Sequence, residues 1–277
     1  MQNHTHDVTV GSKLVRKKYV NLADGEPERE WLCLSLLARH ASGVAPHPIR
    51  FTHEGDAPVV VMERLPGNPL RNAPASADQI AALGRALRRI YAVPMEAIEV
   101  SGLRERKVGP TEIANVLRSA LNVPRDLSEC DDPQLVKQAL DLAQGHLRSP
   151  GTVPIPRLTT MGIADLNPAN VLWDGKECRL VDFEDGGLTE PAFELADHVE
   201  HIATRLADVY SPEPLVESVS LTDHERHRFR QYRILWATFW LIKLLPGNSG
   251  SRINPAGTTE MQARHLRNLL SGMLHDQ

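Results

Sequence analysis

The feature that most constrains this chain is one segment, residues 161–187, which reads MGIADLNPANVLWDGKECRLVDFEDGG. Two short apolar runs, NVLW and RLVDF, flank DGKEC, whose Asp174-Gly175 pair favours a hairpin turn. Such a hairpin carries Asp182, near the end of its second strand, back beside Asn170 at the start of its first. Asp165 comes five residues before Asn170, across a tight loop. The segment therefore predicts that three oxygen-bearing side chains converge on one site from neighbouring turns.

These residue types suit phosphoryl transfer from a nucleotide. The reaction needs an aligned hydroxyl nucleophile and metal ions that bridge the phosphates. Mg²⁺ prefers oxygen ligands, so Asn170 and Asp182 are suitable metal ligands, and Asp165 is suited to orient the acceptor hydroxyl. Asp, Asn and Pro also cap ordinary turns, and that interpretation stays open for Asp165 and Asn170 taken alone. The hairpin that carries Asp182 favours the catalytic interpretation.

Charge and cysteine content argue against several classes of protein. A net charge of −4 gives no reason to expect a nucleic acid or an anionic membrane as partner. No apolar run approaches the ~20 residues that span a bilayer, and the first ten residues lack the basic and apolar regions of a secretory signal. The three cysteines are widely spaced and form no CxxC motif, which is typical of reduced thiols. We therefore expect a cytoplasmic protein, and nothing indicates a protein partner.

The first quarter of the chain predicts strands and one helix. HDVTV and KLVRKKYV flank Gly11-Ser12, a pair suited to a hairpin turn. EREWLCLSLLARH, residues 28–40, has apolar residues at helical spacing, and APVVVMER, residues 57–64, reads as a buried strand. The strand ends at Leu65-Pro66-Gly67, a strong break in secondary structure. We place the boundary between two lobes there.

Helices dominate the remainder. A possible capping box at residues 76–79 opens one helix, apolar spacing marks a second near residue 115, and Asp132-Pro133 opens a third. Further helices are expected near residues 193–203, 232–239 and 266–273. The pattern predicts an α+β, bilobed fold, with a small mostly-β lobe over residues 1–66 and a larger helical lobe over residues 67–277. A cleft between two lobes is a natural ligand site.

ADLNPANVLW followed by RLVDFEDGG resembles the aminoglycoside phosphotransferase and choline kinase family, relatives of protein kinases. That family's pattern is His-Gly-Asp, an Asn five residues after the Asp, and then Asp-Phe-Glu or a similar triplet. The resemblance implies a protein-kinase-like fold, with Asp165 as the catalytic-loop aspartate and with Asn170 and Asp182 as metal ligands. It implies ATP or GTP with Mg²⁺ as cofactors. The implied acceptor is a hydroxyl of a small molecule, such as an aminoglycoside or other antibiotic, an amino alcohol or a sugar.

The resemblance extends to the N-terminal part. LVRKKYV resembles the strand whose basic residue meets the nucleotide α- and β-phosphates, and Arg16 is the first choice for that residue. Lys18 shares its strand face and Lys17 lies on the opposite one, so the register stays open. EREWLCLSLL resembles the helix whose glutamate pairs with the basic residue, and Glu30 fits best. VVVMERLPG resembles the interlobe linker, and the residues whose backbone groups are expected to bind adenine are Met62, Glu63, Arg64 and Leu65.

Two features depart from the family pattern. Ile163 and Ala164 stand where the family usually has His and Gly, so the loop must be held without that histidine's hydrogen bonds. Only about a dozen residues precede the basic strand, which leaves little room for a Gly-rich phosphate loop, so we expect that loop to be short or absent. Gly11-Ser12 reads better as a plain hairpin turn. These departures leave two alternatives open: a catalytically impaired, pseudokinase-like scaffold, or a kinase-like enzyme that phosphorylates peptide Ser or Thr with a partner protein.

Two further expectations concern the acceptor. The helical region over residues 101–148 is the expected acceptor side. A run of four acidic residues could meet a cationic acceptor, but we interpret it as helix N-terminal and surface charge. Its members are Glu190, Glu194, Asp197 and Glu200.

Overall fold

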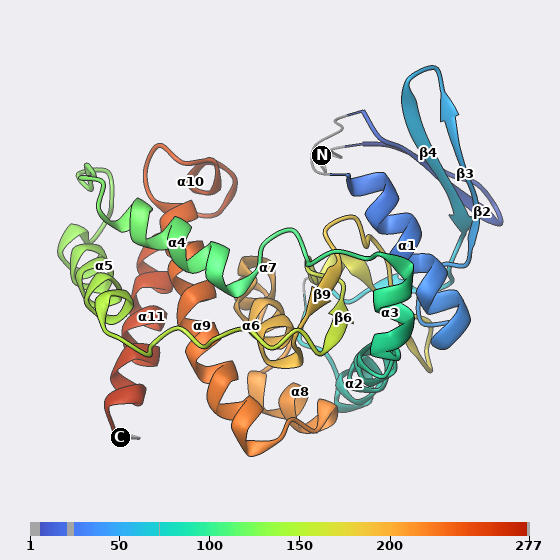
Figure 1. Ribbon diagram of the computed structural model, residues 1–277. Helices are drawn as coiled ribbons and strands as arrows, with labels where there is room; N and C mark the ends of the chain where they lie inside the picture. Colours follow the sequence, from blue (N-terminus) through green and yellow to red (C-terminus); the bar gives the residue numbers. More distant parts are fainter. Residues whose placement is uncertain (1–5, 21–24, 72, 276–277) are drawn as a thin grey trace.

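The computed structural model describes residues 6–20, 25–71 and 73–275, and it begins with a small antiparallel sheet (Figure 1). The sheet has four strands in the order β1-β2-β4-β3. Their bounds are Asp7–Val10 for β1, Leu14–Lys18 for β2, Pro48–Glu54 for β3 and Ala57–Glu63 for β4. Helix α1, Glu26–His40, packs against β3 and β4. Its buried face carries Cys33, Leu34 and Leu37, so the helical spacing in the sequence marks the side that covers the sheet.

The first hairpin forms where the sequence predicts it. Gly11 N–H donates to the Leu14 carbonyl over 2.8 Å and closes the turn between β1 and β2. Strand β3 was not expected from the sequence, because PIRFTHE is a half-exposed edge strand with mixed polarity. Its turn to β4 contains Gly55 at φ 62°, a left-handed conformation that glycine adopts without a steric cost.

The remainder of the chain is mostly helical. After the short strand β5, Asn68–Pro69, the helices are α2 (Ala77–Tyr91), α3 (Met95–Ser101), α4 (Pro110–Leu121) and α5 (Pro133–Arg148). The expected capping box at Ser76 and Gln79 begins α2, and Asp132 caps α5 by accepting from Leu135 N–H over 2.9 Å. The later helices are α6 (Pro191–Glu200), α7 (Ile202–Leu206), α8 (Pro212–Val219), α9 (Asp223–Leu244), α10 (Ser249–Ile253) and α11 (Thr258–His275).

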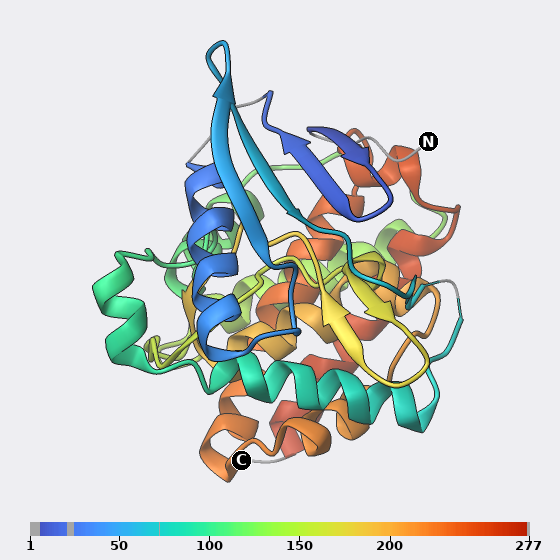
Figure 2. The ribbon, with the colours of Figure 1, turned by 90° about the vertical axis from the view of Figure 1, so that its right-hand side faces the viewer.

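Between α5 and α6 the chain forms two small antiparallel pairs. Strand β6 (Thr160–Gly162) pairs with β9 (Gly187–Thr189), and β7 (Val171–Trp173) pairs with β8 (Cys178–Leu180). The β7–β8 hairpin turns at Asp174 and Gly175, as expected, and lies beside α2 (Figure 2). Strand β5 pairs with β7, so the chain joins the β7–β8 hairpin of the mostly helical part directly after it leaves the four-stranded sheet.

Two apolar clusters hold the helices together on either side of α9. The larger extends from α1 and β4 through α2 and β8 to α6, where Phe193 meets Tyr232 of α9 edge to face. The smaller joins α5, α9 and α11 through Val136, Ile234 and Ala263. The expected α+β arrangement, a small antiparallel sheet followed by a mostly helical remainder, is confirmed. No helix in the described part of the chain is long and apolar enough to cross a membrane.

Candidate active site

The loop between β6 and β7 holds Asp165 in a strained turn. Asp165 N–H donates to the Ile163 carbonyl over 3.0 Å, and Ala164 between them has φ 70°. Asn170 closes the loop, because its side-chain amide donates to the Asp165 carbonyl over 3.0 Å. Asn167 caps the short 3₁₀ helix Pro168–Asn170 by accepting from Ala169 N–H. The five-residue spacing seen in the sequence thus corresponds to one closed, hydrogen-bonded loop.

The β7–β8 hairpin brings Asp182 to the same place. Val181 N–H donates to the Asn170 carbonyl over 3.0 Å, so the end of the hairpin lies against the loop. Asp182 itself has φ 74°, a conformation that costs free energy for a residue with a side chain and that is found mainly at functional sites. Asp165, Asn170 and Asp182 all line one cavity of about 560 Å³. The convergence expected from the sequence is present.

A cluster of four charged side chains lies at the inner wall of this cavity. Lys17 Nζ is 2.9 Å from a Glu30 oxygen, 2.5 Å from Asp182 and 2.6 Å from Glu184, and we call these four residues the Lys17 cluster. Burial alone would lower the pKa of Lys17, but the facing carboxylates Glu30 and Asp182 raise it well above its usual value. Lys17 is therefore a permanent cation that faces three acids.

The structure corrects the choice of Arg16 as the basic residue of this strand. Arg16 Nε donates to Glu54 of β3 over 3.0 Å, on the partly exposed side of the sheet. Lys17 is 6 % exposed and points the opposite way, because neighbouring residues of a strand face opposite sides of the sheet. Lys18 also lies on the outer side, 3.8 Å from Glu54. The expected glutamate is in place, since Glu30 contacts Lys17.

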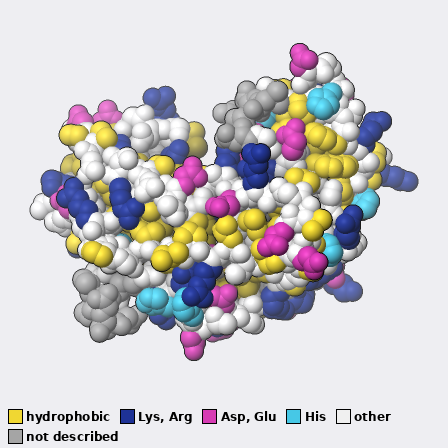
Figure 3. Space-filling view, in the orientation of Figure 1, with side chains coloured by type: hydrophobic (Ala, Val, Ile, Leu, Met, Phe, Trp, Pro, Cys, Tyr) yellow, Lys and Arg dark blue, Asp and Glu magenta, His cyan; other side chains and the backbone are white. Residues whose placement is uncertain are grey.

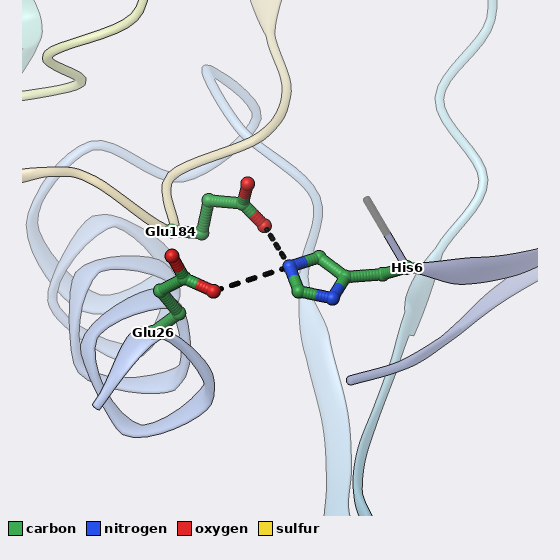
Figure 4. Close-up of side chains that lie close together, drawn as sticks. All are labelled: His6, Glu26 and Glu184. Atoms are coloured by element: carbon green, nitrogen blue, oxygen red, sulfur yellow. Dashed lines mark ion pairs between the residues drawn. The ribbon is translucent and has the colours of Figure 1, made fainter. Parts of the chain in front are cut away.

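His6 is a further residue of this region, and no sequence motif indicates it. Its Nε2 lies 3.1 Å from Glu184 and 3.3 Å from Glu26 at the start of α1, and all three side chains point toward one another (Figure 4). Burial lowers the pKa of His6, and the Lys17 charge lowers it further, so the ring is neutral at pH 7. His6 thereby lies between the start of α1 and the segment 182–184, beside the Lys17 cluster.

The expected linker residues also line the cavity. They are Met62, Glu63, Arg64 and Leu65. The N–H groups of Glu63 and Arg64 donate to the carbonyls of His47 and Lys13, so neither is free for a ligand. Among the hydrogen bonds of residues 6–20, 25–71 and 73–275, none uses the Leu65 N–H, which makes Leu65 the donor available beside the cavity. The surface is notched between the N-terminal sheet and the helices around α4 and α10 (Figure 3).

A second charged group supports the loop that carries Asp165. Arg106, from the segment between α3 and α4, lies 2.8 Å from Glu194 and 2.5 Å from Asp197 of α6, and we call these three residues the Arg106 cluster. Glu194 Oε1 accepts the N–H groups of Ile163 and Ala164, and Arg106 donates to the Ala164 carbonyl. These bonds hold the loop without a histidine at position 163, where the Ile163 side chain is fully buried in the core.

The acidic run on α6 is neither a surface feature nor free to meet a ligand, which corrects the expectation of surface charge. All four acids are buried. Glu190 accepts from Arg228 and from Tyr232 OH, and Glu200 pairs with Arg233 and His265, while Glu194 and Asp197 belong to the Arg106 cluster. A buried carboxylate is retained where it is paired and hydrogen-bonded. The run therefore stabilises the helical part from inside.

The Asp165 side chain remains half exposed, at 51 %. Burial of its surroundings and the nearby charges of Asp182 and Asp185 raise the pKa of Asp165 to about 6. His201 Nε2 lies 3.7 Å from it, and burial lowers the pKa of His201 to about 4. Because His201 Nδ1 accepts from Ala203 N–H, the neutral ring carries its proton on Nε2, which faces Asp165.

The donor set at this site fits Mg²⁺. Asp182 and Asn170 offer oxygen atoms to one cavity, and the Lys17 cluster sets three carboxylates against one ammonium group. Hard divalent cations prefer such oxygen ligands. The local excess of negative charge is therefore of the kind that a bound cation neutralises.

Comparison with known proteins places the chain among phosphotransferases. A profile of the phosphotransferase enzyme family matches residues 11–228. Two solved structures illustrate the shared fold. One is the GDP complex of aminoglycoside 2′-phosphotransferase-IIIa, at TM-score 0.64 and 15 % identity over 96 % of this chain and 89 % of that one. The other is a choline/ethanolamine kinase family protein from Mesorhizobium loti, at TM-score 0.62 and 16 % identity over 98 % and 86 %.

A third solved structure with this fold is spectinomycin phosphotransferase in complex with ADP and spectinomycin. It matches at TM-score 0.58 and 14 % identity over 95 % of this chain and 93 % of that one. A search of curated protein sequences found no match.

Proposed function

This chain belongs to the phosphotransferase enzyme family, and from that premise we propose that it transfers the γ-phosphoryl group of ATP or GTP to a hydroxyl of a small molecule. One observation carries the proposal. Lys17, Glu30, Asp165, Asn170 and Asp182 come from four separate segments and line one cavity. A strand lysine paired with a helix glutamate, opposite a loop aspartate and two metal-binding side chains, is the set of parts that phosphoryl transfer requires.

The N-terminal lobe, residues 1–66, supplies the nucleotide side in this proposal. Lys17, held in one position by Glu30, meets the nucleotide phosphates, and Leu65 offers its free N–H to the base. The valines of the β1–β2 hairpin that line the cavity, Val8, Val10 and Val15, cover the base with apolar surface. Spectinomycin phosphotransferase and aminoglycoside 2′-phosphotransferase-IIIa were solved with ADP and with GDP, which supports nucleotide use here.

Asp182 and Asn170 are the residues that would hold Mg²⁺, and the neighbouring Glu184 lies 3.1 Å from His6. Bound Mg²⁺ supplies positive charge that neutralises the nucleotide phosphates during transfer. Asp182 already contacts Lys17, so the residue that binds metal and the residue that binds phosphate share one hydrogen-bonded arrangement. The strained backbone of Asp182 keeps its carboxylate at the cavity wall.

The C-terminal lobe, residues 67–277, carries Asp165 and the acceptor. Asp165 accepts a hydrogen bond from the acceptor hydroxyl and aligns it with the γ-phosphate. A pKa of about 6 leaves the Asp165 carboxylate mostly ionised at pH 7 while making it a better proton acceptor than an ordinary aspartate. His201 holds a neutral N–H toward the same carboxylate and limits its rotation.

The proposal is tested by phosphoryl transfer from γ-labelled ATP and GTP in the presence of Mg²⁺, with panels of hydroxyl compounds and of Ser- or Thr-containing peptides. We expect transfer to small molecules. We also expect Asp165→Asn to lower kcat by about 10² to 10⁴, which is the usual contribution of a positioned base. The variant keeps nucleotide affinity, because the Lys17 cluster is unchanged. Wild-type rates in Asp165→Asn, or transfer to peptides alone, would contradict the proposal.

A further inference from the structure

We infer that the acceptor is a neutral or anionic hydroxyl compound with an apolar ring body, and not a polycation; this inference rests on the proposed function. The basis is a second cavity of about 770 Å³ beside the catalytic loop. Asn167 lines both this cavity and the one that holds the Lys17 cluster. His201, whose ring faces Asp165, lines the second cavity. A molecule in it therefore lies next to the catalytic aspartate.

This acceptor cavity is formed by α7, α9 and α10 and the catalytic loop. It is not formed by residues 101–148, where the acceptor side was expected from the sequence. Aromatic faces are provided by Phe239 and Trp240, and aliphatic groups by Ile202, Leu206 and Ile253. Apolar and aromatic walls of this kind recognise the body of a ligand by burial of its apolar surface.

The charges of the acceptor cavity do not suit a polycation. No Asp or Glu is among the described residues that line it, Lys243 is the one charged residue of this lining, and the catalytic Asp165, which faces His201, lies at its edge. Lys243 Nζ lies over the Phe239 ring, 5.4 Å from the centroid, and forms no ion pair with any acid in the described part of the chain. His201 adds no charge, because its ring stays neutral at pH 7.

The nearest acids on the neighbouring helix α6 do not change this balance. Asp197 and Glu194 are paired with Arg106, and Glu200 is paired with Arg233 and His265. Their carboxylates are buried and turned into the fold, so they offer nothing to an ammonium group in the cavity. Polycation binding needs several free carboxylates, whereas a single unpaired lysine attracts a carboxylate or other anion.

The test compares three alcohols that share one ring and differ only in charge: 4-(hydroxymethyl)benzoate, 1,4-benzenedimethanol and 4-(aminomethyl)benzyl alcohol. The polycationic aminoglycoside kanamycin is the fourth probe. Each is titrated into the ¹⁵N-labelled full chain without nucleotide, and binding is followed at the indole N–H resonance of Trp240, assigned with Trp240→Phe. We expect the carboxylate to bind tightest and the ammonium compound about three- to tenfold more weakly, as one partly exposed ion pair allows. Kanamycin binds more weakly than any of the three.

Two charge-reversal variants distinguish an effect of Lys243 in the cavity from an effect of the protein's net charge. Lys243→Glu reverses the order of affinities. Lys137→Glu, an equal change on an exposed face of α5 that lines neither cavity, preserves it. The inference is overturned if kanamycin or the ammonium compound binds wild type tightest, if the order survives Lys243→Glu, or if no probe shifts the Trp240 resonance. Phosphoryl transfer to kanamycin would overturn it while leaving the proposed function intact, and failure of nucleotide binding would do the reverse.

Discussion

The Lys17 cluster and the Arg106 cluster are built alike and differ in how completely their acids are satisfied. Each places one cation against acids from distant segments; the Arg106 cluster bonds directly to the loop that carries Asp165, and the Lys17 cluster adjoins it through Val181, the neighbour of Asp182. In the Arg106 cluster both Glu194 oxygens are hydrogen-bonded, to Arg106 and to two backbone N–H groups, and the residue is fully buried. In the Lys17 cluster Glu30 is also buried and hydrogen-bonded, to Tyr19 O–H and Phe183 N–H, whereas Asp182 and Glu184 share the one lysine and the Asp182 side chain is 38 % exposed to the cavity.

This difference distinguishes a cluster that supports the backbone from a cluster suited to bind a ligand. A buried group that has all its partners holds the backbone in one arrangement. Charged groups in a cavity that are short of partners store binding free energy for a ligand that supplies the missing charge. We therefore propose that the same types of side chain have different tasks in the two clusters: the Arg106 cluster supports the loop, and the Lys17 cluster binds a ligand.

The largest effect on stability is expected from a matched pair of acid-to-amide substitutions. Glu194→Gln removes the charge that faces buried Arg106, so the free energy of unfolding should fall by about 3 kcal/mol, the lower end for breaking a buried pair. Asp182→Asn removes one of three acids that crowd Lys17, so stability should stay within about 1 kcal/mol of wild type, as expected for a half-exposed site. Urea unfolding of both variants measures the difference. Equal losses would show that the two clusters do not differ in the way described.

A smaller effect on stability is expected from pH, through His201 beside Asp165. The His201 pKa of about 4 lies below the ordinary value of 6.5, so the unfolded chain binds more protons between these values. Keeping His201 neutral costs the folded protein nothing above pH 6.5, where the unfolded chain is neutral too. As the pH falls from 6.5 toward 4, the unfolded chain gains the proton first, and the free energy of unfolding decreases. At pH 5 this one residue should lower the free energy of unfolding by about 2 kcal/mol relative to pH 7.

The measurement is urea unfolding of wild type and His201→Gln at pH 7 and pH 5. The variant should lose less stability on acidification, because Gln does not titrate. An identical pH dependence in the two proteins would show that His201 is not held neutral in the fold.

The smallest effect is expected at the outer face of the sheet, where Arg16 pairs with Glu54. Both side chains are partly exposed, at 31 % and 48 %, and surface pairs contribute little. Arg16→Gln should leave urea unfolding and nucleotide affinity unchanged, whereas Lys17→Gln, one residue away, should abolish nucleotide binding. Loss of nucleotide affinity in Arg16→Gln would restore Arg16 as the phosphate-binding residue.

How much of the site the sequence predicts depends on how local its geometry is. Asp165, Asn170 and Asp182 lie within one loop and one hairpin, so spacing and a turn signal sufficed to bring them together. The choice between Arg16 and Lys17 needed the register and the buried side of a strand. Tertiary packing sets that side, and a basic strand with charges on both faces gives no hydrophobic pattern to read.

The residues that sequence reasoning missed act across long separations. His6 meets Glu184, and Arg106 meets Glu194 and Ala164, through loops that carry no motif. The α6 acids looked like surface charge because their cationic partners lie elsewhere in the chain. Strand β3 was missed because an edge strand buries little and so lacks a strong alternation. A basic residue in a loop opposite buried acids can be recognised only once the fold is known.

The central claim, that a magnesium-bound nucleotide completes the Lys17 cluster, is tested most directly by unfolding in the presence of Mg²⁺ and a non-hydrolysable ATP or GTP analogue. At a ligand concentration one hundred times Kd, wild type should gain about 2.7 kcal/mol. In Asp182→Asn that gain should shrink and no longer depend on Mg²⁺, while Asp165→Asn should behave as wild type. No gain with millimolar ATP or GTP analogue, or an undiminished Mg²⁺-dependent gain in Asp182→Asn, would contradict the account.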